Sequence, residues 1–382
     1  MVDNFGDIGV AWRLCRRLAK IQSKYKICLV VDDLDAFSKI EDELPRHLTN
    51  EASVIARSAA TKQSININGI EIFPWHEDDF CHDTFIQNDG ERLSLILELF
   101  QCGRPDWMER ILFEEKLNRT VQIIMIDYLT AESYAEDFHC LQSLTRSAKV
   151  QKVNFMPGFT EKTGGLVIDE AWLEVPVRKA DGPVLVFTYE KDWKELVEGW
   201  LSLSKPPYEP KLLMAQGRGK ESFMEAVEAC GAGEFVEELP YLNQTEWDEM
   251  MKGCSALVIR GEESMSRACL SGIPFIWQAY PQSDEYQLVK VKALLERMRR
   301  HFAAEDFEIV ERAWLDINGE TCIATPSARN DEASVRNEYS AFFAAVDRLA
   351  PGFYDFAASL RKNGDLCANL MTFIEKIAII EQ

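Results

Sequence analysis

The second half of the chain alternates short apolar runs with helix-like segments, and this alternation restricts the possible folds more than any other feature. Strands are expected at the apolar runs 184–189, 211–216, 234–239, 256–261 and 274–280. Segments with helical periodicity accompany them at 193–203, 221–229, 245–253, 263–270 and 286–299. Strands that alternate with helices through short connections are typical of a parallel sheet covered by helices on both faces. The sequence therefore predicts an α/β fold.

The first half repeats this pattern less regularly, with apolar runs at 26–31, 70–75, 93–100, 121–129 and 153–159. Between the halves, the stretch VRKADGPV combines charge, glycine and proline, which is typical of a linker. A chain of 382 residues is long enough for two domains. We expect an N-terminal domain over 1–176, a linker over 177–183, a C-terminal domain over 184–337, and C-terminal helices over 338–382 that pack back toward the N-terminal domain.

Composition excludes several classes of protein. Hydrophobic residues make up 47% and charged residues 27%, which is a globular composition. No apolar run approaches the roughly 20 residues of a membrane span, and no secretion signal is evident, so we predict a cytoplasmic protein without a membrane partner. The ten cysteines are scattered without a C-x-x-C pair and the five histidines do not cluster with them, so neither a disulfide framework nor a metal site is expected. A net charge of −21 repels a phosphate backbone, which argues against nucleic acid as a partner.

The opening stretch MVDNFGDIGVAWRLCRRLAK predicts an amphipathic helix preceded by a glycine-containing turn. Val10, Leu14 and Leu18 recur at four-residue spacing and form one apolar stripe. The opposite face is expected to carry the basic residues Arg13, Arg16, Arg17 and Lys20. Two glycines precede this helix and permit the backbone torsions of a turn.

Two aspartates, Asp3 and Asp7, flank the predicted turn. Asp7 is explained equally well as an ordinary helix cap or as a general base, and a carboxylate here also suits a cationic acceptor. The turn lacks a complete G-x-G-x-x-G, which argues against an oxidoreductase. The absence of G-x-x-x-x-G-K-[ST] argues against a P-loop enzyme.

A second candidate site lies in the stretch ALVIRGEESMSRACLSG. A buried strand is expected to end at Arg260, and a helix is expected to open with Glu262, Glu263 and Ser264. A helix N-terminus with an adjacent guanidinium suits a phosphate group. The two glutamates also fit the simpler interpretation of acids that stabilise the first turn of a helix.

Aromatic residues near other strand ends suggest a planar ligand. Phe187 and Tyr189 alternate on one strand, so they should face the same side. Tyr241 and Gln244 follow another strand end. Aromatic residues in strands usually belong to the core, but beside a phosphate site they would stack on a base, which indicates a nucleoside diphosphate as ligand.

Five motifs, in this order, carry a resemblance to a known family: VDNFGDIGVAWRL, GFTEKTGGL, VFTYE, ALVIRGEES and IWQAYPQ. They resemble the bacterial elongation-factor-P arginine rhamnosyltransferases from residue 1 to about 300, with a weaker similarity in NGDLCANLMTF. The resemblance implies a GT-B glycosyltransferase fold, with two Rossmann-like domains facing across a cleft. It also implies an inverting reaction without metal or other cofactor, in which L-rhamnose passes from dTDP-β-L-rhamnose to an arginine of elongation factor P.

The resemblance implies a role for each matched residue. Asp7 is implied as the general base, Asp3 as a support of the site and the acceptor, and Glu262 as necessary for activity. The implied donor-binding residues are Phe187, Tyr189, Tyr241, Gln244, Arg260, Glu263 and Ser264. The chain departs from the family pattern at three positions, where phenylalanine, aspartate and histidine are usual in place of Tyr241, Glu263 and Gln287.

Two alternatives stay open from the sequence. One is a nucleotide-sugar-dependent glycosyltransferase of the same architecture that acts on a small molecule or a glycan. The other is a non-catalytic protein-binding module on this fold. The resemblance further implies roughly ten residues ahead of Met1 that form a first, central strand, so we expect a true start upstream or a truncated form whose sheet lacks that strand.

Overall fold

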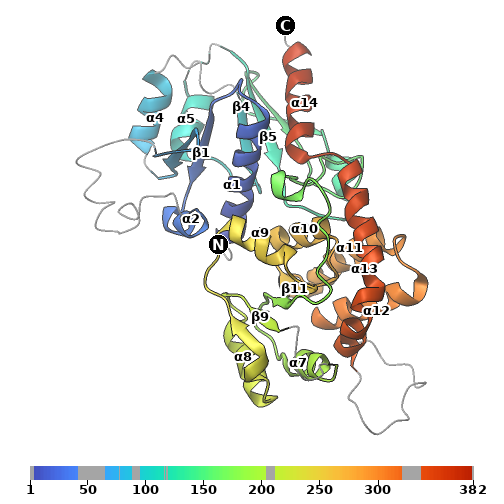
Figure 1. Ribbon diagram of the computed structural model, residues 1–382. Helices are drawn as coiled ribbons and strands as arrows, with labels where there is room; N and C mark the ends of the chain where they lie inside the picture. The colour runs from blue at the N-terminus through green and yellow to red at the C-terminus, as the bar shows by residue number, and fades with distance from the viewer. Residues whose placement is uncertain are drawn as a thin grey trace. The chain divides into compact units, whose positions relative to one another are not determined.

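The computed structural model divides the chain into two compact units (Figure 1). Unit 1 comprises residues 1–169 and 363–382, and unit 2 comprises residues 170–362. The structure describes residues 4–41, 65–76, 78–87, 95–115, 117, 119–203, 211–320 and 337–380. Within this part of the chain, no helix is both long and apolar enough to cross a membrane.

Unit 2 is built on a five-stranded parallel sheet in the order β10-β9-β8-β11-β12. Its strands are β8 (Val184–Val186), β9 (Leu212–Met214), β10 (Val236–Glu238), β11 (Ala256–Arg260) and β12 (Phe275–Gln278). Each strand lies within one of the apolar runs of the second half, so the predicted parallel sheet is confirmed. Strands β8, β9, β11 and β12 are buried along their whole length, as expected from their apolar sequences, and β11 and β12 end in the polar residues Arg260 and Gln278.

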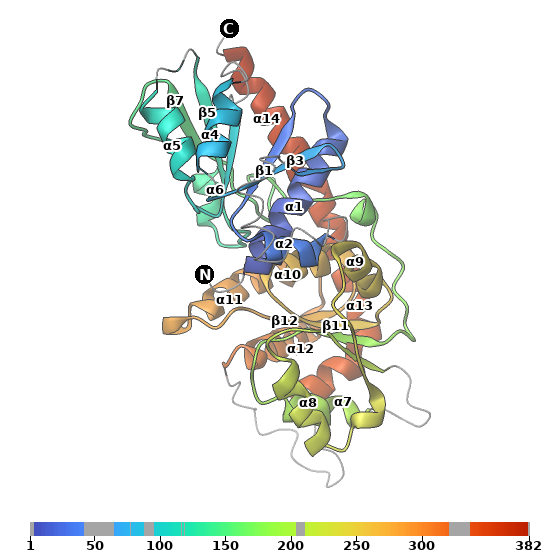
Figure 2. The same ribbon diagram turned by 90° about the vertical axis from the view of Figure 1, so that its left-hand side faces the viewer.

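Helices cover both faces of this sheet. Figure 2 shows α9 and α10 on one side of β11 and β12, and α7, α8 and α12 on the other. The helices of unit 2 are α7 (Lys194–Leu201), α8 (Lys220–Ala229), α9 (Gln244–Lys252), α10 (Glu262–Ser271), α11 (Tyr286–Arg299), α12 (Ala304–Ile317) and α13 (Glu338–Lys362). Residues 177–183, predicted as a linker, lie inside unit 2, where Gly182 packs closely against the backbone of Gly253.

Unit 1 contains two sheets in the described residues, in the orders β1-β3-β2 and β4-β5-β7-β6. The first consists of β1 (Ile27–Val31), β2 (Ile65–Ile67) and β3 (Ile70–Pro74), and the second of β4 (Leu95–Leu99), β5 (Val121–Ile126), β6 (Gln142–Ser143) and β7 (Val150–Asn154). Pairing is parallel except for β2 with β3 and β6 with β7. Strands β1 and β4 therefore each form an edge of their own sheet. The run 153–159 was expected as a strand, but β7 ends at Asn154.

Among its described residues, unit 1 has the helices α1 (Asn4–Ile21), α2 (Leu34–Ile40), α4 (Asp78–Gln87), α5 (Asp106–Phe113), α6 (Tyr134–Phe138) and α14 (Leu366–Ile380). The predicted turn ahead of α1 is wrong, because the helix already begins at Asn4 and includes Gly6 and Gly9. Neither glycine adopts a positive φ. The predicted apolar stripe is confirmed by Leu14 and Leu18, which are buried.

Ion pairs and apolar contacts hold α1 in unit 1. Arg13 was expected on the polar face, but its side chain is buried. The buried charge is paired, because Arg13 Nη1 donates to Asp169 Oδ2 at 2.5 Å. Arg17 Nε donates to Asp365 Oδ2 at 2.9 Å, just before α14. Helices α1 and α14 lie side by side (Figure 1), and Leu14 shares a buried cluster with residues of α14. The two C-terminal helices thus belong to different units: α13 to unit 2, α14 to unit 1.

Candidate active site

The strand order of unit 2 reverses between β8 and β11, since the chain runs outward from β8 to β10 and then returns to the other side of β8. In open α/β sheets, ligands bind beyond the carboxyl ends of the strands at such a switch point. Phe187 directly follows β8, and Arg260 is the last residue of β11. The topology therefore brings these two predicted donor-binding residues together.

Arg260 lies between two aromatic rings at this edge of the sheet. Its guanidinium carbon lies 4.3 Å from the ring centroid of Phe187 and 4.5 Å from that of Tyr189. Both aromatic side chains thus face the same side of the chain, as their alternation predicted. Gly217 is required here, because a Cβ at that position would lie 2.9 Å from the Phe187 ring and 3.4 Å from Arg260 Nη2. Arg260 is buried, and both rings contact its guanidinium group.

Buried polar side chains secure the neighbouring strand ends. The backbone N–H of Tyr189 donates to Gln278 Oε1 at 2.7 Å, and the N–H of Ala279 donates to Asn318 Oδ1 at 2.9 Å. The Tyr189 ring also meets the Tyr280 ring edge-on at a centroid distance of 5.3 Å. Sequence reasoning missed Gln278 and Asn318. A glutamine that ends the apolar run FIWQ was the available signal for the first of them.

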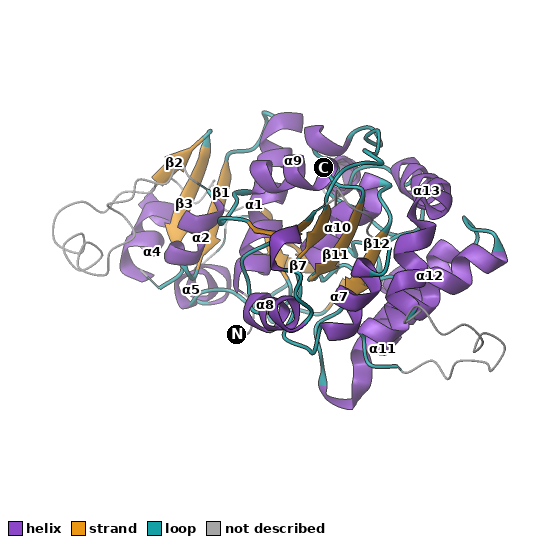
Figure 3. Cartoon of the chain, turned by 60° about the horizontal axis from the view of Figure 1, so that its bottom comes forward, coloured by secondary structure: helices purple, strands orange, loops and turns teal. Residues whose placement is uncertain are grey.

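Helix α10 begins next to Arg260 and directs its N-terminus at the same edge of the sheet. Gly261 precedes the helix with φ 73°, a conformation that other residues rarely adopt. The Trp277 indole N–H donates to the Gly261 carbonyl oxygen at 3.2 Å. Figure 3 shows α10 beside β11 in the sheet of unit 2. A helix N-terminus with an adjacent arginine is an electrostatic arrangement that favours an anion such as a diphosphate.

The two glutamates of the first turn of α10 have different partners. Lys290 of α11 donates to Glu262 Oε1 at 2.9 Å. Glu263 lies 3.6 Å from the Nε of Arg267, one turn along the same helix. Both carboxylates are only partly exposed, and these ion pairs restrain their orientations. Lys290 and Arg267 were not identified as site residues from the sequence.

The remaining predicted donor-binding residues lie nearby in sequence but differ in exposure. Ser264 is buried in α10, whereas Tyr241 is 72% exposed. Gln244 is the first residue of α9, just after Asn243, whose side chain caps that helix. Gln287 accepts a hydrogen bond from the N–H of Gln282 at 3.1 Å, so it holds the loop after β12.

The predicted catalytic aspartate Asp7 lies in unit 1. Asp7 lies in the first turn of α1 and accepts a hydrogen bond from the Tyr128 hydroxyl at 3.1 Å. Tyr128 follows the carboxyl end of β5 and was not predicted from the sequence. Asp3 lies outside the described residues.

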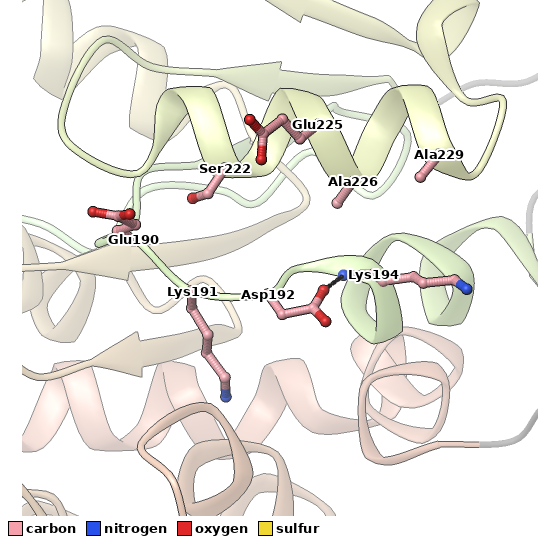
Figure 4. Close-up of a pocket in the computed structure, with 8 residues that line it drawn as sticks. All are labelled: Glu190, Lys191, Asp192, Lys194, Ser222, Glu225, Ala226 and Ala229. Carbon is pink, nitrogen blue, oxygen red and sulfur yellow. Dashed lines mark hydrogen bonds between the residues drawn. The ribbon is translucent and has the colours of Figure 1, made fainter.

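A separate groove of about 650 Å³ lies between α7 and α8 (Figure 4). It is lined by Glu190, Lys191, Asp192, Lys194, Ser222, Glu225, Ala226 and Ala229, and by none of the predicted site residues. Lys191 points away from α8 and donates to the carbonyl oxygens of Asp316 and Ile317 at 2.9 and 3.1 Å (Figure 4). Burial lowers the pKa of this lysine. We therefore attribute a structural role to Lys191.

The described cysteines are free thiols, and burial raises the pKa of Cys15 and of Cys254 to about 12. Such thiols stay protonated and unreactive near neutral pH. In the ranges that the structure covers, no group of three or more histidine, cysteine, aspartate or glutamate side chains is arranged to hold a metal ion.

Comparison with known proteins gives a family match over residues 1–375, to a model described as the elongation factor P (EF-P) rhamnosyltransferase EarP. A protein-arginine rhamnosyltransferase of Shewanella oneidensis is 29% identical over 331 residues, which are 77% of this chain and 78% of that protein. The protein-arginine rhamnosyltransferase of Pseudomonas aeruginosa is 28% identical over 348 residues, covering 83% of this chain and 85% of that protein.

Solved structures are similar at a lower level. One, described as the structural basis for EarP-mediated arginine glycosylation of translation elongation factor EF-P, has a TM-score of 0.45 and 18% identity, covering 74% of this chain and 98% of that chain. A kitacinnamycin glycosyltransferase has a TM-score of 0.46 and 11% identity, covering 97% of this chain and 95% of that chain. The family match, with the parallel pairing in both units, confirms the GT-B fold class predicted from the sequence. How the two units face each other stays a prediction.

Proposed function

The chain belongs to the EarP family of elongation-factor-P rhamnosyltransferases, and from this premise we propose that it transfers L-rhamnose from dTDP-β-L-rhamnose to an arginine of elongation factor P, with inversion. It is a glycosyltransferase, as the sequence predicted. The observation that supports the donor class most directly is Arg260, stacked between Phe187 and Tyr189 beside the start of α10. This arrangement suits the diphosphate of a nucleotide sugar.

In the proposed reaction, a guanidinium nitrogen of the acceptor attacks the anomeric carbon of rhamnose. The bond between that carbon and the diphosphate oxygen breaks, and dTDP leaves with the electron pair. A proton from the attacking nitrogen passes to the Asp7 carboxylate, which acts as general base. A guanidinium is a weak nucleophile because it stays protonated at neutral pH, so an adjacent carboxylate is chemically necessary.

Arg260 and the N-terminus of α10 are the proposed stabilisers of the leaving diphosphate. Their positive charge would do what a divalent cation does in metal-dependent glycosyltransferases, so we propose that the reaction needs no metal and no cofactor other than the donor. Tyr241 and Gln244 are proposed to contact the thymine base, and Glu263 and Ser264 the rest of the nucleotide. Glu262, held by Lys290, is proposed to act on the donor sugar.

The closing experiment incubates the full chain with elongation factor P and dTDP-β-L-rhamnose, with EDTA present. Mass spectrometry should find one deoxyhexose on one arginine, and NMR of the product should show an α-linked sugar. Asp7→Asn should abolish transfer and leave dTDP binding unchanged. Transfer to a small molecule or a glycan, but not to elongation factor P, would favour a nucleotide-sugar-dependent glycosyltransferase with a different acceptor. Stable binding of elongation factor P without transfer would favour a non-catalytic binding module.

The cytoplasm is the proposed place of this reaction, because the acceptor is a translation factor. Elongation factor P and the nucleotide sugar are then the expected partners. The net charge of −21 suits a protein that binds an acceptor through a cationic arginine rather than one that binds nucleic acid.

A further inference from the structure

Two consecutive residues after β4 adopt a backbone conformation that is rare for their type. Phe100 has φ 55° and Gln101 has φ 54°, both in the left-handed region. A bulky non-glycine residue persists in this region only where its surroundings enforce it, and such residues are frequent at functional sites. Here the Phe100 N–H donates to the Ile126 carbonyl oxygen at 2.9 Å, and the Cys102 N–H donates to that of Leu99 at 3.0 Å.

This turn fixes the residues that follow the neighbouring strand β5. The Phe100 ring stacks on the Tyr128 ring, with centroids 4.6 Å apart and planes inclined by 22°. Gln101 Nε2 donates to Asp127 Oδ2 at 2.7 Å. Asp127 Oδ1 in turn accepts from the backbone N–H of Tyr128 at 2.8 Å. The left-handed turn therefore restrains both the ring and the backbone of Tyr128.

The hydroxyl of this restrained tyrosine reaches the carboxylate of Asp7, 121 positions away in the sequence, at 3.1 Å. Tyr128 is 41% exposed, so burial alone does not hold its ring in place. We propose that Tyr128, held by Phe100 and Gln101, is a positioning residue that orients the Asp7 carboxylate for rhamnosyl transfer. This inference rests on the proposed function.

The physical basis is the precision that general-base catalysis requires. A carboxylate must be held close to its productive geometry by neighbours whose own conformations are locked. The Tyr128 hydroxyl donates to Oδ2 of Asp7 and keeps its own proton throughout, so it restricts the rotation of the carboxylate without taking part in proton transfer. A hydrogen bond of this kind also stabilises the charged form of a carboxylate.

The test compares Tyr128→Phe with the wild-type chain in steady-state transfer to elongation factor P. Phenylalanine keeps the stacking on Phe100 and removes only the hydroxyl. We expect kcat to fall about tenfold, equivalent to about 1.4 kcal/mol, with KM for the donor within twofold of wild type. The acid limb of the pH–rate profile should move to higher pH, because the charged carboxylate loses a hydrogen bond. Phe100→Leu should lower kcat by a smaller factor, since the hydroxyl is kept and only its support is loosened.

A matched control is Tyr134→Phe, because Tyr134 is 40% exposed on α6 and also packs against a phenylalanine, Phe138. This variant should retain wild-type kcat. The inference is overturned if Tyr128→Phe keeps kcat within twofold, if its pH–rate profile does not move, or if the control loses as much activity.

A second measurement separates this inference from the proposed function. Urea unfolding of the single and double variants of Asp7→Ala and Tyr128→Phe forms a double-mutant cycle that does not depend on activity. A coupling free energy different from zero is expected, and a coupling of zero would refute the contact. If the wild-type chain transfers no rhamnose, the proposed function fails whatever the cycle shows.

Discussion

The stacked arginine of unit 2 yields the most quantitative prediction. Arg260→Lys keeps the positive charge at the end of β11 but replaces a planar fork with a single ammonium group. The substitution should leave the fold intact, because the Phe187 and Tyr189 rings still cover an aliphatic stem. It isolates the contribution of guanidinium geometry to donor binding.

The expected magnitude follows from the contacts of Arg260. The two rings at 4.3 and 4.5 Å contact the guanidinium in the free chain as well, so their stacking energy does not itself add to the affinity for dTDP. Loss of one of two charge-assisted hydrogen bonds to the diphosphate costs roughly 2 kcal/mol. The dissociation constant for dTDP should therefore be roughly 30-fold higher than that of the wild-type chain. Solvent screening is weak because Arg260 is only 7% exposed.

Isothermal titration calorimetry of dTDP binding measures this effect directly. The matched control is Arg299→Lys, because the Arg299 guanidinium also lies 4.3 Å from an aromatic ring, that of Phe307. Arg299 ends α11, a helix that contains none of the predicted donor-binding residues. The control should bind dTDP like the wild-type chain. Binding by Arg260→Lys within threefold of wild type, or equal losses in both variants, would refute the reasoning.

Two further predictions concern the stability of unit 1. Burial lowers the pKa of His139, whose Nδ1 accepts a hydrogen bond from the Met156 N–H at 3.1 Å. The neutral imidazole therefore stabilises the folded state fully above about pH 6.5, and this stabilisation is lost as the pH falls through the lowered pKa. His139→Asn keeps an acceptor and should flatten the dependence of Tm on pH between 7.5 and 5.5, and an unchanged slope would contradict this. Asp365→Ala removes the carboxylate that accepts from the partly buried Arg17 at 2.9 Å and from the Ile168 N–H, and should cost about 2–3 kcal/mol in urea unfolding. Asp347→Ala, which breaks an ion pair of an 81% exposed carboxylate, should cost less than about 1 kcal/mol, and equal losses would argue against burial as the cause.

The elements of unit 2 could be predicted from the sequence because each depends on local periodicity. The apolar runs of β8 and β11 are buried throughout, and the helix α11 begins and ends at the predicted residues, 286 and 299. The start of α1 could not be predicted in the same way. Glycine in a helix costs roughly 1 kcal/mol relative to alanine, so Gly6 and Gly9 favoured a turn. Contacts of α1 with residues more than a hundred positions away stabilise the helix nonetheless.

In the candidate site, too, local motifs could be predicted from the sequence, whereas long-range contacts could not. Motif resemblance predicted Asp7, Arg260 and their neighbours as site residues, and the structure places Arg260 at the end of β11 and Asp7 in the first turn of α1. Roles assigned to single residues from the sequence stay predictions, and Asp3 lies outside the described part of the chain. Tyr128 and Lys290 were missed, because nothing in their local sequence distinguishes them from ordinary surface residues.

The sequence by itself determined the α/β class, the family, and the residue types available for binding a diphosphate and deprotonating a guanidinium. These depend on periodicity and on short motifs, which are local properties of the chain. Only the tertiary structure decided that Phe187 and Tyr189 hold Arg260, and that Tyr128 meets Asp7. Such contacts join residues tens to more than a hundred positions apart, and their geometry depends on strand order and backbone conformation, which no local pattern specifies.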